Sequence, residues 1–218
     1  MSIDQPLGST DHQPVVVDIE KGTVSGWLRV TLSDGSFFSL PSETIHANGW
    51  EQPGTPADPD IAARLQQQAW QQLIERKALD SLARAEQCRA RLQLKLIAKG
   101  MPAAEVSQVL DELEQRNVLS DRRYAESWVR NRMLRRGEGP LAVQLGLRAR
   151  GIDQHTARAA IDTLQQEYPD LLEQAIQRAA ARLSRSRSTR SPEALRSRLL
   201  REGFPRELVD TELKKYQI

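Results

Sequence analysis

The chain has 218 residues, of which 28% are charged and only 5% aromatic. Cys88 is its one cysteine, so an intramolecular disulfide is excluded, and it has no apolar run of 18 residues and no secretory signal. We therefore expect a cytoplasmic protein without a membrane span. The net charge of +2 conceals an uneven distribution, because residues 1–60 carry −7 and residues 61–218 carry +9.

The acidic first part has the pattern of a small β-structure. Residues 1–13 are polar and small, and we expect them to form a disordered tail. Three runs have the composition of strands: 15–19, 26–32 and 37–40. Asp34-Gly35 separates the last two runs and is a strong hairpin signal, so a β-hairpin region is predicted within residues 14–50. Residues 51–60 contain three prolines and a glycine and are predicted to be a linker.

A 25-residue pattern occurs three times in the rest of the chain, and each copy contains a glycine: Gly100, Gly151 and Gly203. The glycines are 51 and 52 residues apart, and apolar residues recur at the same offsets on both sides of each. The offsets before the glycine fit one face of a short helix, and the glycine suits a left-handed helix end. A second helix then follows. A fixed period of this kind indicates a repeat architecture.

Each copy is preceded by a further helical stretch: residues 80–89, 121–136 and 169–183. The module is therefore three helices, and such modules must stack because one alone buries little core. We predict a mainly α protein with three tandem three-helix repeats in an elongated curved array and a small N-terminal β-hairpin region. The predicted boundaries are 61–117 for a long helix and the first repeat, 118–167 for the second repeat and 168–218 for the third.

Catalytic chemistry has little support in the sequence. None of the three histidines has a His, Cys or acidic partner at metal-ligand spacing, and no phosphate-binding loop or nucleophile motif is present. Cys88 lies in a stretch with a core pattern and is expected to be a small buried hydrophobe. We therefore predict no enzymatic activity, no metal site and no cofactor.

Arginine clusters are the main functional signal. Residues 122–150 carry a net charge of +6 and residues 178–206 carry +7, so both stretches are candidates for binding phosphates or an acidic protein. A solvated helix face is the alternative interpretation. The candidate binding residues are Arg122, Arg123, Arg130, Arg132, Arg135, Arg136, Arg148, Arg150, Arg196 and Arg198. Tyr124 and Trp128 are i, i+4 neighbours and are expected to pack in the core rather than stack on bases. Residues 184–192 form a Ser/Arg tract that we expect to be a basic loop.

Residues 118–152 resemble the central signature of the RecX family of regulatory proteins. The matching residues are Asp121, Tyr124-Ala125, the arginines of 130–136, Gly139-Pro140, Leu145 and Gly151-Ile152. The resemblance extends over residues 78–216. Family members often have two acids where this chain has Ser120-Asp121, and we expect Asp121 to serve as a helix N-cap.

The resemblance implies a cytoplasmic protein without catalytic activity that binds the filament of the RecA recombinase. It also implies that the protein lies in the helical groove of the filament and inhibits its ATPase, strand-exchange and coprotease activities. The implied partners are the RecA filament and single-stranded DNA, with double-stranded DNA as a further candidate, and no membrane; we expect a monomer. The first-choice contact residues are Arg132, Arg135, Arg136, Arg148 and Arg150. The alternative function is that of a DNA-binding or architectural protein with helix-turn-helix-like repeats.

Overall fold

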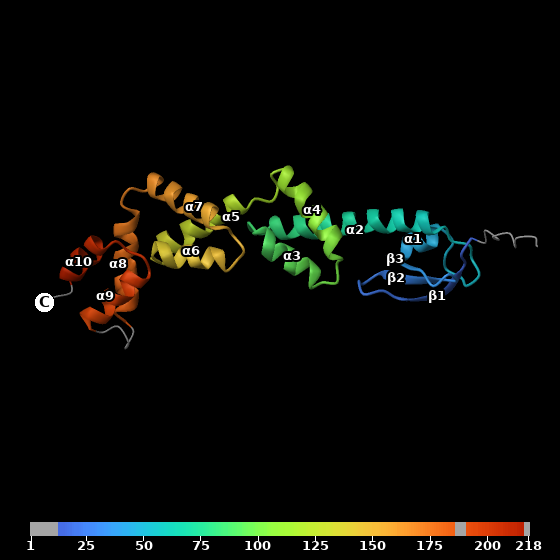
Figure 1. Ribbon diagram of the computed structural model, residues 1–218, viewed down its shortest axis with the longest axis horizontal. Helices are drawn as coiled ribbons and strands as arrows, with labels where there is room; N and C mark the ends of the chain where they lie inside the picture. The colour runs from blue at the N-terminus through green and yellow to red at the C-terminus, as the bar shows by residue number, and fades with distance from the viewer. Residues whose placement is uncertain (1–12, 186–190, 216–218) are drawn as a thin grey trace, which may run out of the picture. The chain divides into compact units, whose positions relative to one another are not determined.

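The computed structural model describes residues 13–185 and 191–215 (Figure 1). It is mostly helical with a three-stranded antiparallel sheet near the N-terminus, which confirms the predicted fold class. Nearly all of the predicted disordered tail and most of the Ser/Arg tract lie outside the described residues. The chain divides into two compact units, Met1–Lys77 with Leu96–Val109 and Ala78–Lys95 with Leu110–Ile218. Each unit is described by itself.

The sheet of the first unit confirms the three predicted strands. Its order is β1 (Val16–Lys21), β2 (Trp27–Leu32) and β3 (Phe37–Pro41), with antiparallel pairing throughout. The turn between β2 and β3 is held by Asp34, whose carboxylate accepts hydrogen bonds from the Ser36 amide at 2.8 Å and hydroxyl at 2.6 Å. These two bonds hold the pKa of Asp34 below its usual value.

Residues 51–58, within the predicted linker, are attached to the sheet. The Val16 amide donates to the Thr55 carbonyl at 2.8 Å, and the Ala57 amide donates to the Pro14 carbonyl at 2.8 Å. Ala57 is fully buried. Prolines lack an amide donor but keep their carbonyls, so a proline-rich segment can still pair with a strand edge. The segment therefore closes the edge of β1 before the next helix begins.

Two helices accompany the sheet, α1 (Ser42–Ala47) and α2 (Pro59–Leu82). Asp58 caps the start of α2, because its carboxylate accepts from the amides of Asp60 at 2.8 Å and Ile61 at 3.2 Å. The expected helix over 80–89 is wrong, since α2 ends at Leu82 and residues 83–88 are not helical. A new helix starts instead at Arg89, whose amide donates to the Asp121 carboxylate at 2.7 Å.

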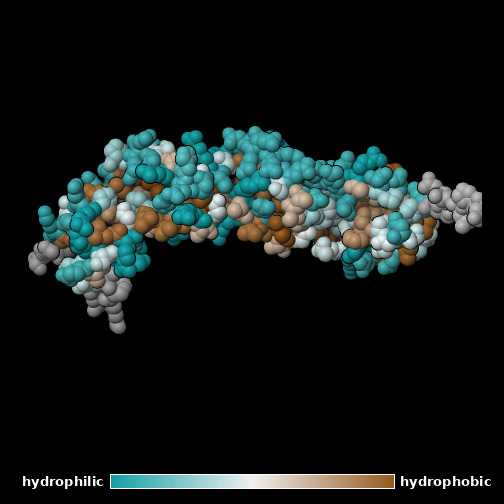
Figure 2. Space-filling view, viewed as in Figure 1, coloured by the Kyte–Doolittle hydropathy of each residue, from teal (hydrophilic) through white to brown (hydrophobic). Residues whose placement is uncertain are grey.

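The helices of the repeats follow in chain order. They are α3 (Arg89–Ile97), α4 (Ala103–Gln115), α5 (Asp121–Arg130), the π-helix η1 (Asn131–Arg135), α6 (Pro140–Arg148), α7 (Gln154–Glu167), α8 (Leu171–Leu183), α9 (Pro192–Arg201) and α10 (Arg206–Lys214). Hydrophobic surface shows over α3 and α6 in Figure 2.

The repeat glycines are the helix ends that the sequence predicts. Gly100, Gly151 and Gly203 have φ values of 83°, 86° and 88°, and they follow α3, α6 and α9. Each glycine amide donates to the carbonyl three residues earlier, and the next amide donates to the carbonyl five residues before it. This pair of bonds is the Schellman motif, which needs a residue that tolerates the left-handed conformation.

Within the second unit, consecutive repeats stack through a contact that is itself repeated. A Cβ at Gly151 would lie 2.6 Å from the Ala90 Cβ, and a Cβ at Gly203 would lie 2.5 Å from the Leu141 Cβ. Ala90 and Leu141 each stand ten residues before the glycine of their own repeat. The turn of one repeat therefore rests on the helix that precedes the glycine in the repeat before it, α3 or α6, at an equivalent position.

Backbone hydrogen bonds accompany the second of these contacts. The Glu202 carbonyl accepts from the amides of Leu141 at 3.1 Å and Ala142 at 3.3 Å, which belong to the first turn of α6. The N-cap of α6 is Gly139, which has no side chain to satisfy these amides. The following repeat therefore supplies the acceptor that the helix start requires.

Hydrophobic side chains form a separate core in each of the last two repeats. The core of the second repeat includes Val129, Met133 and Leu147, and the core of the third repeat includes Leu199 and Val209. The α8 helix contributes to both, because its first residue packs in the second-repeat core and its later residues pack in the third. Burial of one such side chain contributes about 1.5–3 kcal/mol. The α8 helix thus holds the two repeats together.

Candidate nucleic-acid interface

A glycine turn brings the end of the α5–η1 segment against α8. Gly137 is buried and has a φ of 62°. A Cβ at this position would lie 2.6 Å from the Arg178 Cβ and 2.7 Å from the Ala175 carbonyl oxygen. Only glycine permits both the left-handed conformation and this approach between two backbones. The turn therefore fixes the arginines that precede it beside those of α8.

A groove of about 510 Å³ lies at this junction, and we call it the cationic groove. Its lining residues are Arg135, Arg136, Glu138, Arg178, Ala181, Arg182 and Arg185. The single acidic residue is occupied, because Glu138 forms a 2.6 Å ion pair with Arg132. Arg182 is paired with Glu202 at 3.1 Å.

The other four arginines of the groove are exposed: Arg135, Arg136, Arg178 and Arg185. Within the described parts of the chain, no carboxylate lies within 4.0 Å of any of them. Four unpaired guanidinium groups around one concave surface raise its affinity for anions. Arginine also presents a planar set of donors that matches two oxygens of one phosphate.

Trp128 organises a second arginine cluster, which we call the tryptophan clamp and which consists of Trp128, Arg132 and Arg150. The guanidinium carbons lie 4.2 Å and 3.7 Å from the Trp128 ring centroid for Arg132 and Arg150, respectively. Arg150 also donates from Nη1 to the Gly146 carbonyl at 2.6 Å. These two arginines are therefore committed to intramolecular contacts.

Tyr124 and Trp128 pack on the second-repeat core, in agreement with the sequence-based expectation. Their rings are stacked with centroids 6.2 Å apart. Burial raises the pKa of the Tyr124 hydroxyl above its ordinary value. The pair is thus a structural element of α5, and no open ring face for a base is needed to explain it.

The π-helix explains why Arg132 is separated from Arg135 and Arg136. An ideal α-helix would place all three on one side, as the sequence spacing suggests. η1 interrupts that spacing between Asn131 and Arg135, since each π-turn contains an additional residue. Arg132 consequently contacts Trp128 and Glu138, whereas the later two arginines line the groove.

Several of the other predicted binding residues hold the fold together. Arg123 donates to Glu86 at 2.9 Å and to the carbonyls of Asn117 at 2.8 Å and Val118 at 2.9 Å. Arg196 forms two hydrogen bonds with Asp210, at 2.8 Å and 3.3 Å. This pairing holds the pKa of Asp210 below its usual value.

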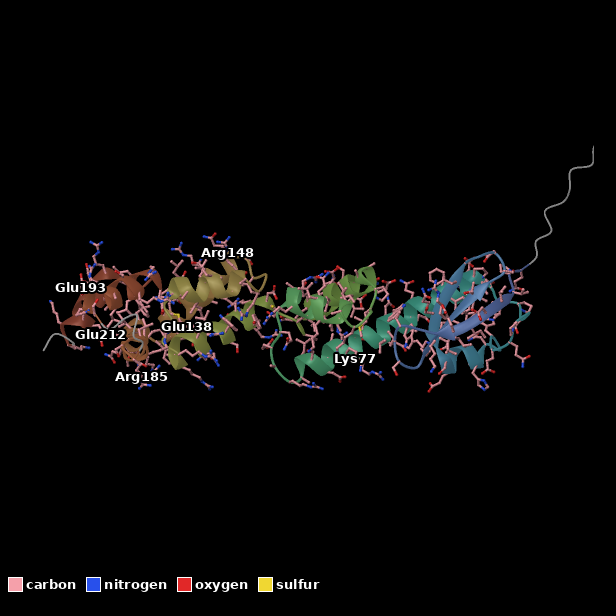
Figure 3. The ribbon with its side chains drawn as sticks, turned by 90° about the horizontal axis from the view of Figure 1, so that it is seen from below. Lys77, Glu138, Arg148, Arg185, Glu193 and Glu212 are labelled. Carbon is pink, nitrogen blue, oxygen red and sulfur yellow. The ribbon has the colours of Figure 1, made fainter. Side chains whose placement is uncertain are left out.

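The remaining candidates are more exposed. Arg130 is paired with Glu167 at 2.7 Å, Arg122 with Glu126 at 2.8 Å, and Arg198 with Glu202 at 3.6 Å. Arg148 is exposed, and it lies at the opposite edge of the second unit from Arg185 in Figure 3. Arg148 therefore does not belong to the cationic groove. The groove instead takes Arg178 and Arg182, which share one face of α8 by their spacing of four, and Arg185, which lies two residues after the end of α8.

Asp121 has a different role from the expected one. Ser120 is the N-cap of α5, because its hydroxyl accepts from the Arg123 amide at 3.2 Å. The Asp121 carboxylate is then available to cap α3 through the Arg89 amide, at 2.7 Å. The neighbouring motif residue Ala125 is fully buried in the second-repeat core. The motif residues Asp121, Tyr124 and Ala125 therefore join the first two repeats and fill the core.

The part of the chain that the structure describes holds neither a metal-ligand cluster nor a membrane-spanning helix. Its His, Cys, Asp and Glu residues form no group of three or more that could hold a metal ion. Among the helices placed there, none is sufficiently long and apolar to cross a membrane.

The comparisons with known proteins agree with this architecture. Residues 120–161 match the family description "RecX, second three-helix domain". Two solved chains share the fold: a regulatory protein RecX (TM-score 0.61, 22% identity, 92% of this chain and 99% of the other) and RecX from Lactobacillus salivarius (TM-score 0.54, 23% identity, 67% and 96%).

Two relatives named regulatory protein RecX are similar in sequence to this chain over most of their own length. The regulatory protein RecX of Chromohalobacter salexigens is 35% identical over 133 residues, which are 61% of this chain and 85% of the relative. That of Pseudomonas entomophila is 32% identical over 136 residues, which are 62% of this chain and 86% of the relative. Since most of each relative is covered at more than 30% identity, this chain belongs to the RecX family of regulatory proteins.

Proposed function

We propose that this protein binds the RecA recombinase filament on DNA and inhibits its ATPase, strand-exchange and coprotease activities. Family membership supports a regulatory role, since the relatives are named regulatory proteins. The recombinase as target is what the resemblance of residues 118–152 implies. No catalytic step is part of this proposal.

The cationic groove is the observation that carries the nucleic-acid part of the proposal. A filament on DNA presents a backbone with one phosphate per nucleotide, and four unpaired arginines around a groove suit such a ligand. No ring stacking on bases is required. Binding through phosphates is independent of sequence, as a regulator acting at any point of a genome needs.

The geometry also orders the candidate contact residues. We assign Arg135, Arg136, Arg178 and Arg185 to the phosphate backbone because they are exposed and unpaired in the described structure. Arg148 is a second exposed candidate away from the groove. Arg123, Arg132, Arg150 and Arg196 are assigned to structure because carboxylates, carbonyls or the Trp128 ring already occupy them.

The decisive measurement is the ATPase rate of the recombinase on single-stranded DNA at increasing concentrations of this protein. The wild type should lower the rate. The variant R135A/R136A/R178A/R185A should need at least about tenfold more protein for the same inhibition, because removing each arginine–phosphate interaction weakens binding by a fraction of a kcal/mol or more. R122A is the matched control, because Arg122 is 79% exposed on the same segment and outside the groove.

Two outcomes would contradict the proposal. An unchanged ATPase rate at saturating wild-type protein, with DNA binding retained, would favour the alternative of a DNA-binding or architectural protein. Equal inhibition by the wild type and the four-arginine variant would remove the cationic groove from the mechanism. Circular dichroism of the variant checks that its helices are intact.

A further inference from the structure

Two exposed leucines occupy equivalent positions in the first two repeats. Leu94 of α3 is 69% exposed and Leu145 of α6 is 53% exposed. Each stands six residues before the glycine of its repeat and directly follows a glutamine, Gln93 or Gln144. Both leucines belong to the second compact unit.

The fold does not require leucine at this position. The third repeat offers an internal comparison, since Ser197 of α9 occupies the equivalent position and is also exposed. In contrast, the position two residues later is a buried leucine in all three repeats: Leu96, Leu147 and Leu199. Single exposed leucines are ordinary on protein surfaces. The same Gln-Leu pair with an exposed leucine in two repeats, and a serine at the leucine position in the third, indicates a purpose other than folding.

The charge around the leucines restricts the kind of partner. Neither α3 nor α6 contains an acidic residue. Arg91 and Lys95 flank Leu94 on exposed positions of α3, and Arg148 lies three residues after Leu145 on α6. A complementary surface would have an apolar pocket with carboxylates around it. A nucleic-acid backbone has no such pocket, so this surface suits a protein partner.

Because the exposed leucine occurs in two repeats, we expect the partner to present two equivalent binding sites. Two equivalent surfaces on stacked repeats match a partner that presents the same pocket twice, and a filament of identical subunits does so. We propose that Leu94 and Leu145 dock in equivalent apolar pockets of two consecutive subunits of the recombinase filament. This inference rests on the proposed function and adds the protein contact to it.

The docking surface is separate from the cationic groove. Arg148, which shares the exposed face of α6 with Leu145, lies at the opposite edge from Arg185 of the groove (Figure 3). Hydrophobic surface over α3 and α6 is visible in Figure 2. The protein subunits and the DNA would therefore meet different faces of the second unit, and variants can distinguish the two contacts.

The test compares binding to a recombinase filament, formed on single-stranded DNA with a slowly hydrolysed ATP analogue, with binding to the same DNA alone. L94Q and L145Q are measured singly and together, and I61S is the control at an apolar side chain of α2 that is 40% exposed. Each single variant should bind the filament about 3- to 10-fold more weakly. The double variant should bind about 10- to 100-fold more weakly, because the effects of two linked contacts on the binding constant multiply. DNA binding and I61S should be unchanged.

The outcomes separate the two levels of the argument. If the wild type does not bind the filament, the proposed function fails and this inference fails with it. If the wild type binds and L94Q/L145Q binds equally well, only the inference is overturned. If one single variant loses as much affinity as the double variant, the claim of two equivalent subunit contacts is overturned. If the double variant also bound bare DNA more weakly, the claim that the leucines and the cationic groove lie on different faces would be contradicted.

Discussion

The tryptophan clamp and the cationic groove draw on the same arginine-rich sequence, yet they differ in what their guanidinium groups contact. In the clamp, Arg132 and Arg150 stack on Trp128 and are bonded to Glu138 and the Gly146 carbonyl, respectively. In the groove, the exposed arginines include Arg135 and Arg136, and no described carboxylate pairs with them. Arginine density in the sequence therefore does not identify a binding surface. A binding surface is identified instead by the contacts that each guanidinium group makes, or does not make, within the protein.

The largest effect is expected from a substitution in the Gly137 turn, which places the two walls of the cationic groove side by side. Gly137→Ala introduces a Cβ 2.6 Å from the Arg178 Cβ, at a φ of 62°. We expect a loss of about 3 kcal/mol in the free energy of unfolding, from backbone strain together with overpacking. Affinity for DNA should fall as well, because the two walls of the groove separate. Urea denaturation and a DNA-binding titration measure the two effects.

Gly49→Ala is the matched control for this experiment. Gly49 also has a positive φ, of 71°, but no atom lies within 4 Å of the position that a Cβ would take. Only the strain remains, so we expect a loss of about 1 kcal/mol and unchanged DNA binding. Equal losses for the two glycines would contradict the close packing of Gly137 against α8.

Two adjacent arginines sharpen the comparison between paired and solvated side chains. Arg123→Ala removes bonds to Glu86 and to two backbone carbonyls and should cost about 2 kcal/mol in unfolding free energy. Arg122→Ala removes one i, i+4 ion pair of a 79% exposed side chain and should cost less than about 0.5 kcal/mol. Chemical denaturation of both variants measures the difference. If the order were reversed, the structural role of Arg123 would be wrong.

The rate at which the Cys88 thiol reacts with a thiol reagent can test the tryptophan clamp, because Cys88 contacts Arg150. The thiol is 1% exposed and donates to the Arg150 carbonyl at 3.3 Å, and burial raises its pKa. Native protein should therefore react slowly with a thiol reagent. Arg150→Ala should accelerate the reaction about tenfold, equivalent to about 1.4 kcal/mol of local opening. Arg178→Ala should leave the rate unchanged, and an equal acceleration by Arg178→Ala would contradict the assignment.

The smallest effect on stability is expected within the groove. Arg178→Ala combined with Arg185→Ala should change the free energy of unfolding by less than about 0.5 kcal/mol. The same variant should lower the slope of log affinity against log salt concentration by about 2, one for each phosphate that is no longer bound. DNA titrations at several salt concentrations measure the slope. A slope identical to that of the wild type would mean that these arginines do not contact phosphate.

Features with local causes could be predicted from the sequence. Asp34-Gly35 specifies the turn between β2 and β3 through its own side chain and flexible backbone. Gly100, Gly151 and Gly203 specify helix ends because only the local conformation is involved. The Asp58 cap of α2 belongs to the same class.

Features that depend on distant residues could not be predicted from one sequence. The break after Leu82 depends on Asp121, which caps α3 from 32 residues away. The split among Arg132, Arg135 and Arg136 depends on a π-helix and on the position of Trp128. The groove itself needs α8 beside Gly137, a contact between residues about 40 positions apart that spacing alone does not reveal.

The way in which α6 begins has a consequence for how such a series of repeats can grow. α6 relies on the Glu202 carbonyl of its successor to satisfy its first amides, since Gly139 offers none. α9 is instead capped by Ser191, whose hydroxyl accepts from the Ala194 amide at 3.2 Å. The second repeat thus depends on the following repeat to satisfy the first amides of α6, whereas the third repeat satisfies an amide of α9 with its own side chain. If a further repeat were added after the third, we would expect a glycine in place of Ser191, so that the backbone of the added repeat could satisfy the first amides of α9.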